Sequence, residues 1–425
     1  MITIKSLVSL SNELLESIVE YLDVPHDLHC LALTCRLLHN IIDPNHLQLR
    51  YIQCQPGRED LWSLLMQRPL LARNVRVLEI RYSLWGYRDG DIVPKAFLEF
   101  KPRNAVPQLE RIQPPESSLS LIKALERMDN LVRFTWNGVY LEDAAMEAIF
   151  ATLGRKGIQE LSLYPRHARP ISETVRTKIP CPMQTLLAVR SLSITKICHC
   201  HACYPHPFYD ALIMTKNLPL TDLYLDFGWV WYGIAANSRI QNLFESAHWP
   251  SLKRFTLKSA SLISNPSSDI MSNFLQRHSR IEALWLPPDL PPPTLEEGML
   301  PCLRSLHFGS WKVNMEYRVP PSIANQLHHF SSPISNMTLS ILDYMPSLKS
   351  CKVIGLGDIA TFVTKVSELE RLHYIWPEEH GHEITLAMKR EVRTNQNQNI
   401  ELIHPLFSMF RPKIVLYHIS HIFLD

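Results

Sequence analysis

The chain has 425 residues, of which 46% are hydrophobic and 20% charged, a composition typical of a globular protein and not of a disordered one. Its formal net charge of +2 argues against the strongly basic surface of a protein that binds nucleic acid through phosphates. With only 13 glycines it has little material for phosphate-binding loops, and its 31 prolines predict many breaks between short elements.

The cysteines and the first residues predict an intracellular protein. Nine cysteines are scattered from Cys30 to Cys351, a distribution that indicates reduced thiols more than a disulfide framework. The first apolar run is interrupted by serines and followed by Glu13 and Glu16, unlike a secretory signal. No run approaches the roughly 18–20 apolar residues that a membrane span needs. We therefore expect a cytoplasmic or nuclear location without membrane contact.

Residues 10–42 are expected to form two amphipathic helices. Ser11 is a suitable N-cap for the first helix, and Pro25 should end it. Asp27 is a suitable N-cap for the second helix, and Pro44 should end that one. Apolar residues recur in both at steps of three and four. Two such helices bury too little surface to be stable alone, so they need a third element or a partner. They could equally cap whatever follows.

This stretch resembles the F-box motif, which in outline reads Leu-Pro-x-Glu-Leu-Leu-x-x-Ile, then Leu, then Asp-Leu, then Val-Cys-Arg-x-Trp. Ser11 stands where proline is usual, Thr34 replaces the valine and Leu38 replaces the tryptophan. Leu38 fills less volume than tryptophan, which would weaken binding of a partner. The residues at the matching places are Leu10, Glu13, Leu14, Leu15, Ile18, Leu22, Asp27, Leu28, Cys35 and Arg36.

The resemblance implies a role in ubiquitin ligation. An F-box binds a Skp-family adaptor, which links it to a cullin scaffold, while the chain behind it holds the cargo. Other subunits of that family's ligases transfer ubiquitin, so this chain would be a receptor and not an enzyme. Some of the apolar residues must pack between the helices, and the sequence does not separate the two groups. The adaptor-facing set that the resemblance implies is Leu10, Leu14, Leu15, Ile18, Leu28 and Leu31.

A six-residue pattern, apolar-x-x-apolar-x-apolar, recurs through the rest of the chain. Clear units begin at residues 75, 131, 158, 189, 220, 252, 281, 303, 348 and 369, and weaker ones at 109 and 327. The mean spacing, about 27 residues, is similar to that of leucine-rich repeats. The longer steps leave room for helices, as at 141–154 and 267–279. The alternative is a set of unrelated strands in an ordinary α/β domain.

A strand alternates its faces, so the fourth and sixth residues of each unit should point into a core and the third and fifth to an open face. Aromatic and charged side chains on such a face are typical of protein-binding surfaces, although solvated strand faces would look the same. The predicted substrate-binding residues are Arg133, Tyr224, Asp226, Arg254, Lys258 and Trp285.

The units lack the Asn or Cys that normally follows each leucine-rich strand, so the resemblance is to a degenerate array. We predict an α/β fold in which residues 1–55 form the F-box with a short N-terminal extension. Residues 56–378 would form an irregular leucine-rich solenoid, with parallel strands on its concave face and helices and loops on its convex face. Residues 379–425 would be a C-terminal cap or tail.

The stretch "CHCHACYPH" at residues 198–206 is the one candidate for metal chemistry. Cys198, Cys200, Cys203 and His206 are of the types that zinc prefers, but Cys-x-Cys-x-x-Cys lacks the paired spacing of a zinc finger, and we interpret the stretch as a loop. No catalytic motif occurs, and no metal or cofactor is expected.

The function that we expect is therefore recruitment of an unknown protein substrate to a cullin-type ubiquitin ligase. The alternatives are a leucine-rich scaffold that binds no adaptor and a zinc-binding protein centred on residues 198–206.

Overall fold

The structure is a computed structural model of the whole chain. It describes residues 7–22, 24–81, 92–94, 114–138, 143–165, 183–195, 211–227, 235–258, 267–287, 290, 293–308, 319–333, 343–354, 370–375, 383–389 and 401–403. The chain divides into two compact units. The first comprises residues 1–221 and 225–228, and the second comprises residues 222–224 and 229–425.

The first unit opens with helices. They are η1 (Leu7–Ser9), α1 (Asn12–Glu20), α2 (Pro25–Ala32), α3 (Arg36–Ile42), η2 (Asp43–Leu47) and α4 (Gln48–Arg50). The predicted second helix is in fact two, because Cys35 is extended and separates α2 from α3. Pro25 begins α2, where its missing N–H costs nothing, so Val24 and not Asp27 precedes the helix. Pro44 does not end the segment, since the chain continues through it as a wide π-turn.

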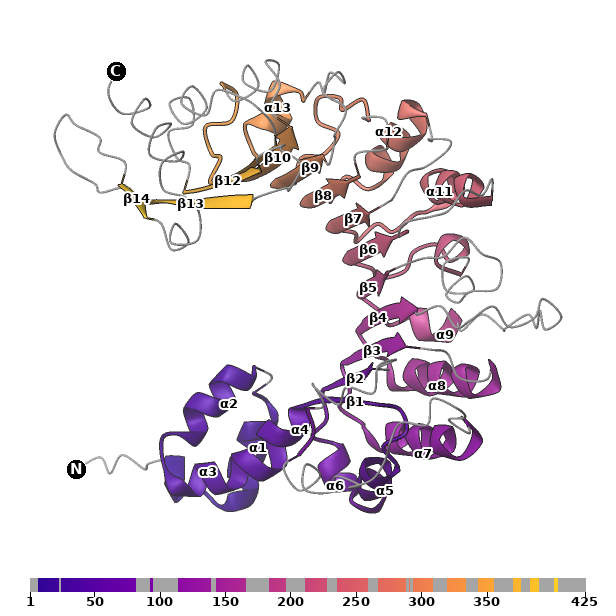
Figure 1. Ribbon diagram of the computed structural model, residues 1–425, viewed down its shortest axis with the longest axis vertical. Coiled ribbons are helices and arrows are strands. Elements are labelled where there is room, and N and C mark those ends of the chain that lie inside the picture. Colours follow the sequence, from indigo (N-terminus) through magenta and orange to yellow (C-terminus); the bar gives the residue numbers. More distant parts are fainter. Residues whose placement is uncertain are drawn as a thin grey trace, which may run out of the picture. The chain divides into compact units, whose positions relative to one another are not determined.

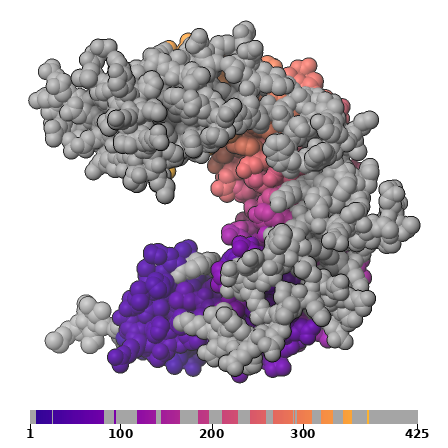
Figure 2. All heavy atoms as spheres, viewed as in Figure 1, coloured from indigo at the N-terminus to yellow at the C-terminus, as the bar shows by residue number. Residues whose placement is uncertain are grey.

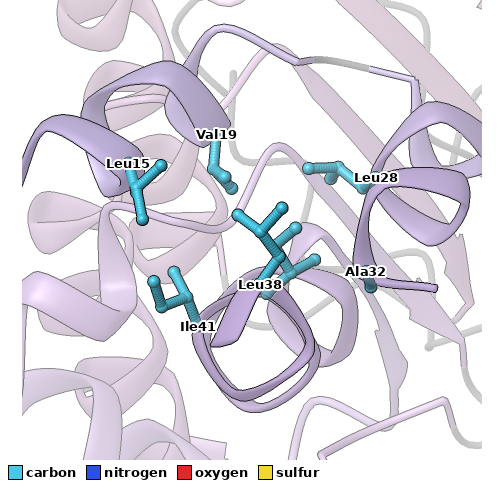
Figure 3. Close-up of a cluster of buried hydrophobic side chains, with 7 residues drawn as sticks. Leu15, Val19, Leu28, Ala32, Leu38 and Ile41 are labelled. Atoms are coloured by element: carbon cyan, nitrogen blue, oxygen red, sulfur yellow. The ribbon is translucent and has the colours of Figure 1, made fainter. Parts of the chain in front are cut away.

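A small hydrophobic core holds these helices together. Leu15 and Val19 of α1 meet Leu28 of α2 and Leu38 of α3, and all four are buried (Figure 3). The third helix is thus the additional element that two short helices lack. Leu38, which stands at the tryptophan position of the motif, is 2% exposed and fills the centre of this core.

Parallel strands follow in the first unit. They are β1 (Tyr51–Cys54), β2 (Val77–Arg81), β3 (Arg133–Gly138), β4 (Glu160–Pro165) and β5 (Ser191–Ile194), each paired with the next along the chain. The helices between them are α5 (Glu59–Gln67), α6 (Pro69–Ala72), α7 (Pro114–Arg127), α8 (Asp143–Lys156) and α9 (Met183–Leu186). Helices α7, α8 and α9 line one side of the strands (Figure 1). Strand β1 falls inside residues 1–55, the segment predicted as the F-box, for which only helices were expected.

The division between the units falls within β6 (Asp222–Asp226). The second unit continues with β7 (Arg254–Lys258), β8 (Ala283–Leu286), β9 (Ser305–Phe308), β10 (His329–Pro333), β11 (Ser350–Ile354) and β12 (Arg371–Ile375), which pair in parallel in chain order. Strands β13 (Glu383–Lys389) and β14 (Glu401–Ile403) are added antiparallel. Its helices are α11 (Ala235–Ser246), α12 (Ser268–Arg277) and α13 (Pro321–Ala324).

The strands confirm the alternation that the six-residue pattern predicts. The fourth and sixth residues of the units at 158, 189, 220, 252 and 281 are at most 3% exposed, whereas the third and fifth are half-buried or exposed. The weaker unit at 327 is the regular strand β10, and the weaker unit at 109 lies outside the described residues. No helix in the described part of the chain combines the length and the hydropathy of a membrane span.

Helix α8 shows how a glycine ends a helix and turns the chain into a strand. Gly157 has a φ of +66°, its N–H donates to the Gly154 carbonyl oxygen at 3.1 Å, and the Ile158 N–H donates to the Leu153 carbonyl oxygen at 3.4 Å. These two bonds satisfy carbonyl groups that the helix leaves unpaired at its end. Ile158 is buried and β4 begins two residues later, so the turn sets where that strand enters the sheet.

Gly157→Ala should lower the free energy of unfolding by about 1–2 kcal/mol, because an L side chain is disfavoured in the left-handed region. The space itself is adequate, since the nearest side-chain atom would lie 3.8 Å from the new Cβ. Gly57→Ala is the matched control, because open space surrounds Gly57 and its φ is ordinary. Denaturant unfolding of the two variants would test this, and an equal effect of both would contradict it.

An aromatic cluster surrounds a buried histidine in the second unit. The Phe274 ring lies 5.1 Å from the ring of Phe244 and 5.1 Å from that of Phe255, measured between centroids. Nε2 of His278 accepts the Trp249 backbone N–H at 2.9 Å, and its Nδ1–H donates to the Phe274 carbonyl oxygen at 2.7 Å. Burial lowers the pKa of His278 to about 4, so the ring is neutral at pH 7. The hydrogen bond that Nε2 accepts needs this neutral form, because a protonated ring has no free lone pair there.

His278 should make the protein sensitive to acid. Its pKa is depressed in the folded state, so the unfolded chain binds the proton first and stability falls as the pH drops from 6.5 towards 4. Between pH 6.5 and 5 the loss from this group is about 2 kcal/mol. Denaturant unfolding at pH 7 and pH 5 should show a smaller acid-induced loss in His278→Gln than in the unchanged protein, and equal losses would refute this account.

Candidate functional site

The six residues of the predicted adaptor-facing set fall into three groups. Leu15 and Leu28 are buried in the core of the N-terminal helices, and Leu10 and Leu31 are half-buried against that core. Leu14 and Ile18 of α1 are 54% and 37% exposed. The structure therefore separates the packing residues from those that are available to a partner, which the sequence did not do.

Other apolar side chains of these helices are also exposed. Tyr21 is 87% exposed, Val24 52% and Leu33 71%. In the space-filling view these helices, in indigo, form part of the outer surface on the face that is drawn (Figure 2). Helices that only cap a repeat array usually present a polar outer face. The exposed apolar side chains of α1 to α3 therefore favour a binding surface over a cap.

Two arginines attach the N-terminal helices to the first strands. Nη2 of Arg50 donates to the carbonyl oxygens of Val19 and Glu20 at 2.8 and 3.2 Å, and Nη2 of Arg76 donates to that of Glu20 at 2.9 Å. Both cations thus satisfy the C-terminal end of α1. Burial, with the positive charges of Arg50 and Arg76, lowers the pKa of the nearby His46 to about 4.

Arg50 immediately precedes β1, and Arg76 immediately precedes β2. The orientation of α1 is therefore fixed by the start of the sheet, not by a flexible linker. The side chain of Asn74 adds a third link, since its Nδ2 donates to the carbonyl oxygen of Asn45 at 2.8 Å.

On the open face of the first unit, the charged residues that the structure describes largely neutralise one another. Arg133, one of the predicted substrate-binding residues, pairs with Glu160 on the next strand. Arg81 pairs with Glu79 at 2.6 Å, and the hydroxyl of Tyr51 donates to the same carboxylate at 2.6 Å. Burial and that hydrogen bond raise the pKa of Tyr51 to about 12. This face presents paired charges and small hydroxyl side chains.

The open face of the second unit is different, because aromatic and basic residues gather there in one row. The register of the strands places one residue from each of β7 to β11 side by side. The rings of Trp285 and His307 stack, with centroids 4.8 Å apart and planes 18° apart. We call this set the β7–β11 row: Thr256, Trp285, His307, Ser331 and Lys352.

Lys258 extends the row towards β6. Its Nζ lies 5.4 Å from the centroid of the Tyr224 ring and 5.2 Å from that of the Trp285 ring, distances at which a cation is attracted to an aromatic face. Three of the predicted substrate-binding residues are thus brought together.

The other predicted residues are placed differently. Arg254 pairs with Asp222, so its charge is compensated. Asp226, also on β6, is among the residues assigned to the first unit.

Two polar members of the row are held in low-polarity surroundings. Burial lowers the pKa of His307 to about 4, and the charges of Lys352 and Lys258 act in the same direction, so its ring is neutral at pH 7. Ser331 is 6% exposed, and its Oγ has no hydrogen-bond partner among the described residues. A buried hydroxyl without a partner is costly, so a ligand that supplies one would be favoured here.

His307, Ser331 and Lys352 were missed by sequence reasoning. The signal was present, because each is the fifth residue of its unit, as Trp285 is of the unit at 281. Comparing the fifth positions of successive units would have found the row.

The predicted metal candidates, Cys198, Cys200, Cys203 and His206, lie outside the described residues. Within the described ranges no three His, Cys, Asp or Glu side chains are grouped so as to hold a metal ion.

No protein-family model matches the chain, and no curated protein matches it either. Its function therefore has to be inferred from the two surfaces just described.

The neutral state of His307 can be measured by NMR titration. We expect a pKa of about 4, and we expect Lys352→Met to raise it towards 6.5 because a positive charge near the ring is removed. Lys123→Met, on an exposed position of α7, is the control and should leave the titration unchanged. If the pKa of His307 does not rise in Lys352→Met, the two side chains do not interact as the geometry requires.

Proposed function

We propose that this chain is a substrate-recognition subunit of a cullin-type ubiquitin ligase. In this proposal the helices α1 to α3 act as an F-box and bind a Skp-family adaptor. The strands and helices that follow them in the chain form a degenerate leucine-rich solenoid, which binds a protein substrate on its concave face. The chain would act in the cytoplasm or nucleus. It would need no catalytic residue, since other subunits of such a ligase transfer the ubiquitin.

One observation carries the proposal most directly. The N-terminal helices have a buried core of their own and still expose Leu14 and Ile18 on the same helix, α1. Leu14 is four residues before Ile18, so the two lie on one face, as a partner-binding helix requires. Both positions belong to the F-box resemblance in the sequence.

The attachment of α1 gives this arrangement a physical rationale. A receptor must hold its substrate at a defined place relative to the ligase that modifies it. Arg50 and Arg76 tie the end of α1 to the starts of β1 and β2, so an adaptor bound to α1 would be held in a fixed relation to the first strands.

The rival proposal is a repeat scaffold in which the helices are only a cap. It is less favoured, because a cap gains nothing from an exposed apolar face. The two proposals differ in one measurable property, which is adaptor binding.

Leu14→Asp should weaken binding of a Skp-family adaptor by about 30-fold or more, because a carboxylate would be buried without a partner at the interface. Leu14 is largely exposed in the free chain, so folding should be unaffected. Co-purification of the full-length variant with the adaptor, followed by calorimetry, would measure the loss.

The matched control is Leu119→Asp, which places the same charge at a 56% exposed leucine of α7. It should bind the adaptor normally. If the unchanged chain binds no adaptor, the scaffold proposal stands instead. Adaptor binding that survives Leu14→Asp and Ile18→Asp together would show that the interface is elsewhere.

A further inference from the structure

A cysteine and a histidine lie side by side on the outer face of α2. Sγ of Cys30 is 3.6 Å from Nε2 of His26, which precedes it by four residues, or about one helical turn. Both side chains are exposed. Leu28 and Ala32, which pack into the core of the N-terminal helices, are about half a turn away around the helix. The pair therefore faces away from that core, where a ligand can reach it.

The distance between the two atoms suits a tetrahedral metal ion. Zinc binds thiolate sulfur at about 2.3 Å and imidazole nitrogen at about 2.0–2.1 Å, so a tetrahedral angle between the two bonds places sulfur and nitrogen about 3.6 Å apart. Cys30 and His26 already have this separation, and the helix need not change to bind the ion. Zinc would take the place of the proton in the hydrogen bond that the two atoms now make.

A structural zinc site needs four ligands, and this pair supplies two of them. Within the described ranges no third His, Cys, Asp or Glu side chain is grouped with the pair so as to complete the site. A second copy of the chain can supply the missing ligands, because a two-fold axis through the ion brings the same cysteine and histidine from each molecule. Two thiolates then balance the charge of the zinc ion, and the ligand set is that of a common structural site.

An exposed leucine on the same face of α2 favours a contact between copies. Leu33 follows Cys30 by three residues and is 71% exposed. In a dimer joined at Cys30 and His26, this side chain would lie against α2 of the other copy. Burial of its apolar surface would add to the free energy of metal binding.

From this geometry we infer that zinc joins two copies of the chain through α2, with Cys30 and His26 of each copy as its four ligands. Each thiol releases its proton to solvent when its sulfur binds the ion, so formation of the dimer is weakened by acid. This inference goes beyond the proposed function and does not rest on adaptor binding.

The test is the mass of the full-length chain in solution, measured by light scattering after size-exclusion chromatography with a phosphine reductant present to prevent disulfides. Without zinc the chain should be monomeric. Zinc chloride at about 50 µM should double the mass, and a chelator should reverse the change. Cys30→Ser and His26→Ala should each stay monomeric in the same zinc concentration and bind about half an equivalent less zinc per chain than the unchanged protein.

Cys302→Ser, which removes another exposed cysteine, is the matched control and should form the dimer normally. Leu14→Asp should also dimerise normally, so failure of this inference is distinguishable from failure of the proposed function. Circular dichroism would show that each variant is folded. The inference is overturned if the unchanged chain stays monomeric in zinc, or if Cys30→Ser and His26→Ala dimerise as the unchanged chain does.

Discussion

In-register pairing of parallel strands is the constraint on which the rest of this structure depends. Each strand pairs with the next so that equivalent residues of successive units lie opposite one another, as Leu284 and Leu306 do in the core. Residues at one position of the unit therefore accumulate on one line across the sheet. A buried position repeated in this way makes a continuous core, and an exposed position repeated in this way makes a continuous surface.

The same constraint allows the open faces of the two units to differ in chemistry. In the first unit the line of fifth positions carries Glu79, Thr135, Ser162 and Ser193, and in the second it carries the aromatic and basic residues of the β7–β11 row. The backbone is equivalent in both, so the open face can change its chemistry without any cost to the core beneath it. A small number of exposed residues can thus define a binding surface on an otherwise uniform sheet.

The N-terminal helices depend on the sheet in a second way. Their core is small, and the carbonyl groups of Val19 and Glu20 at the end of α1 accept hydrogen bonds from Arg50 and Arg76. These arginines are placed by the starts of two strands, so the helical segment and the sheet stabilise each other. The face of α1 that carries Leu14 and Ile18 is exposed, and we assign the adaptor to that face.

The sequence by itself determined the strand positions, the buried fourth and sixth residues of each unit and the presence of the N-terminal helices, because these follow from short-range periodicity. It missed β1, β13 and β14, the break at Cys35 and the continuation through Pro44, because packing against distant residues overrides local preference there. Only the tertiary structure decided that Leu15 is internal while Leu14 is exposed. Equivalent positions in the repeat indicate which residues could share a row with Trp285, but the strand pairing decides that His307 and Lys352 do. Residues far apart in the chain meet only through strand register, which no local pattern of the sequence specifies.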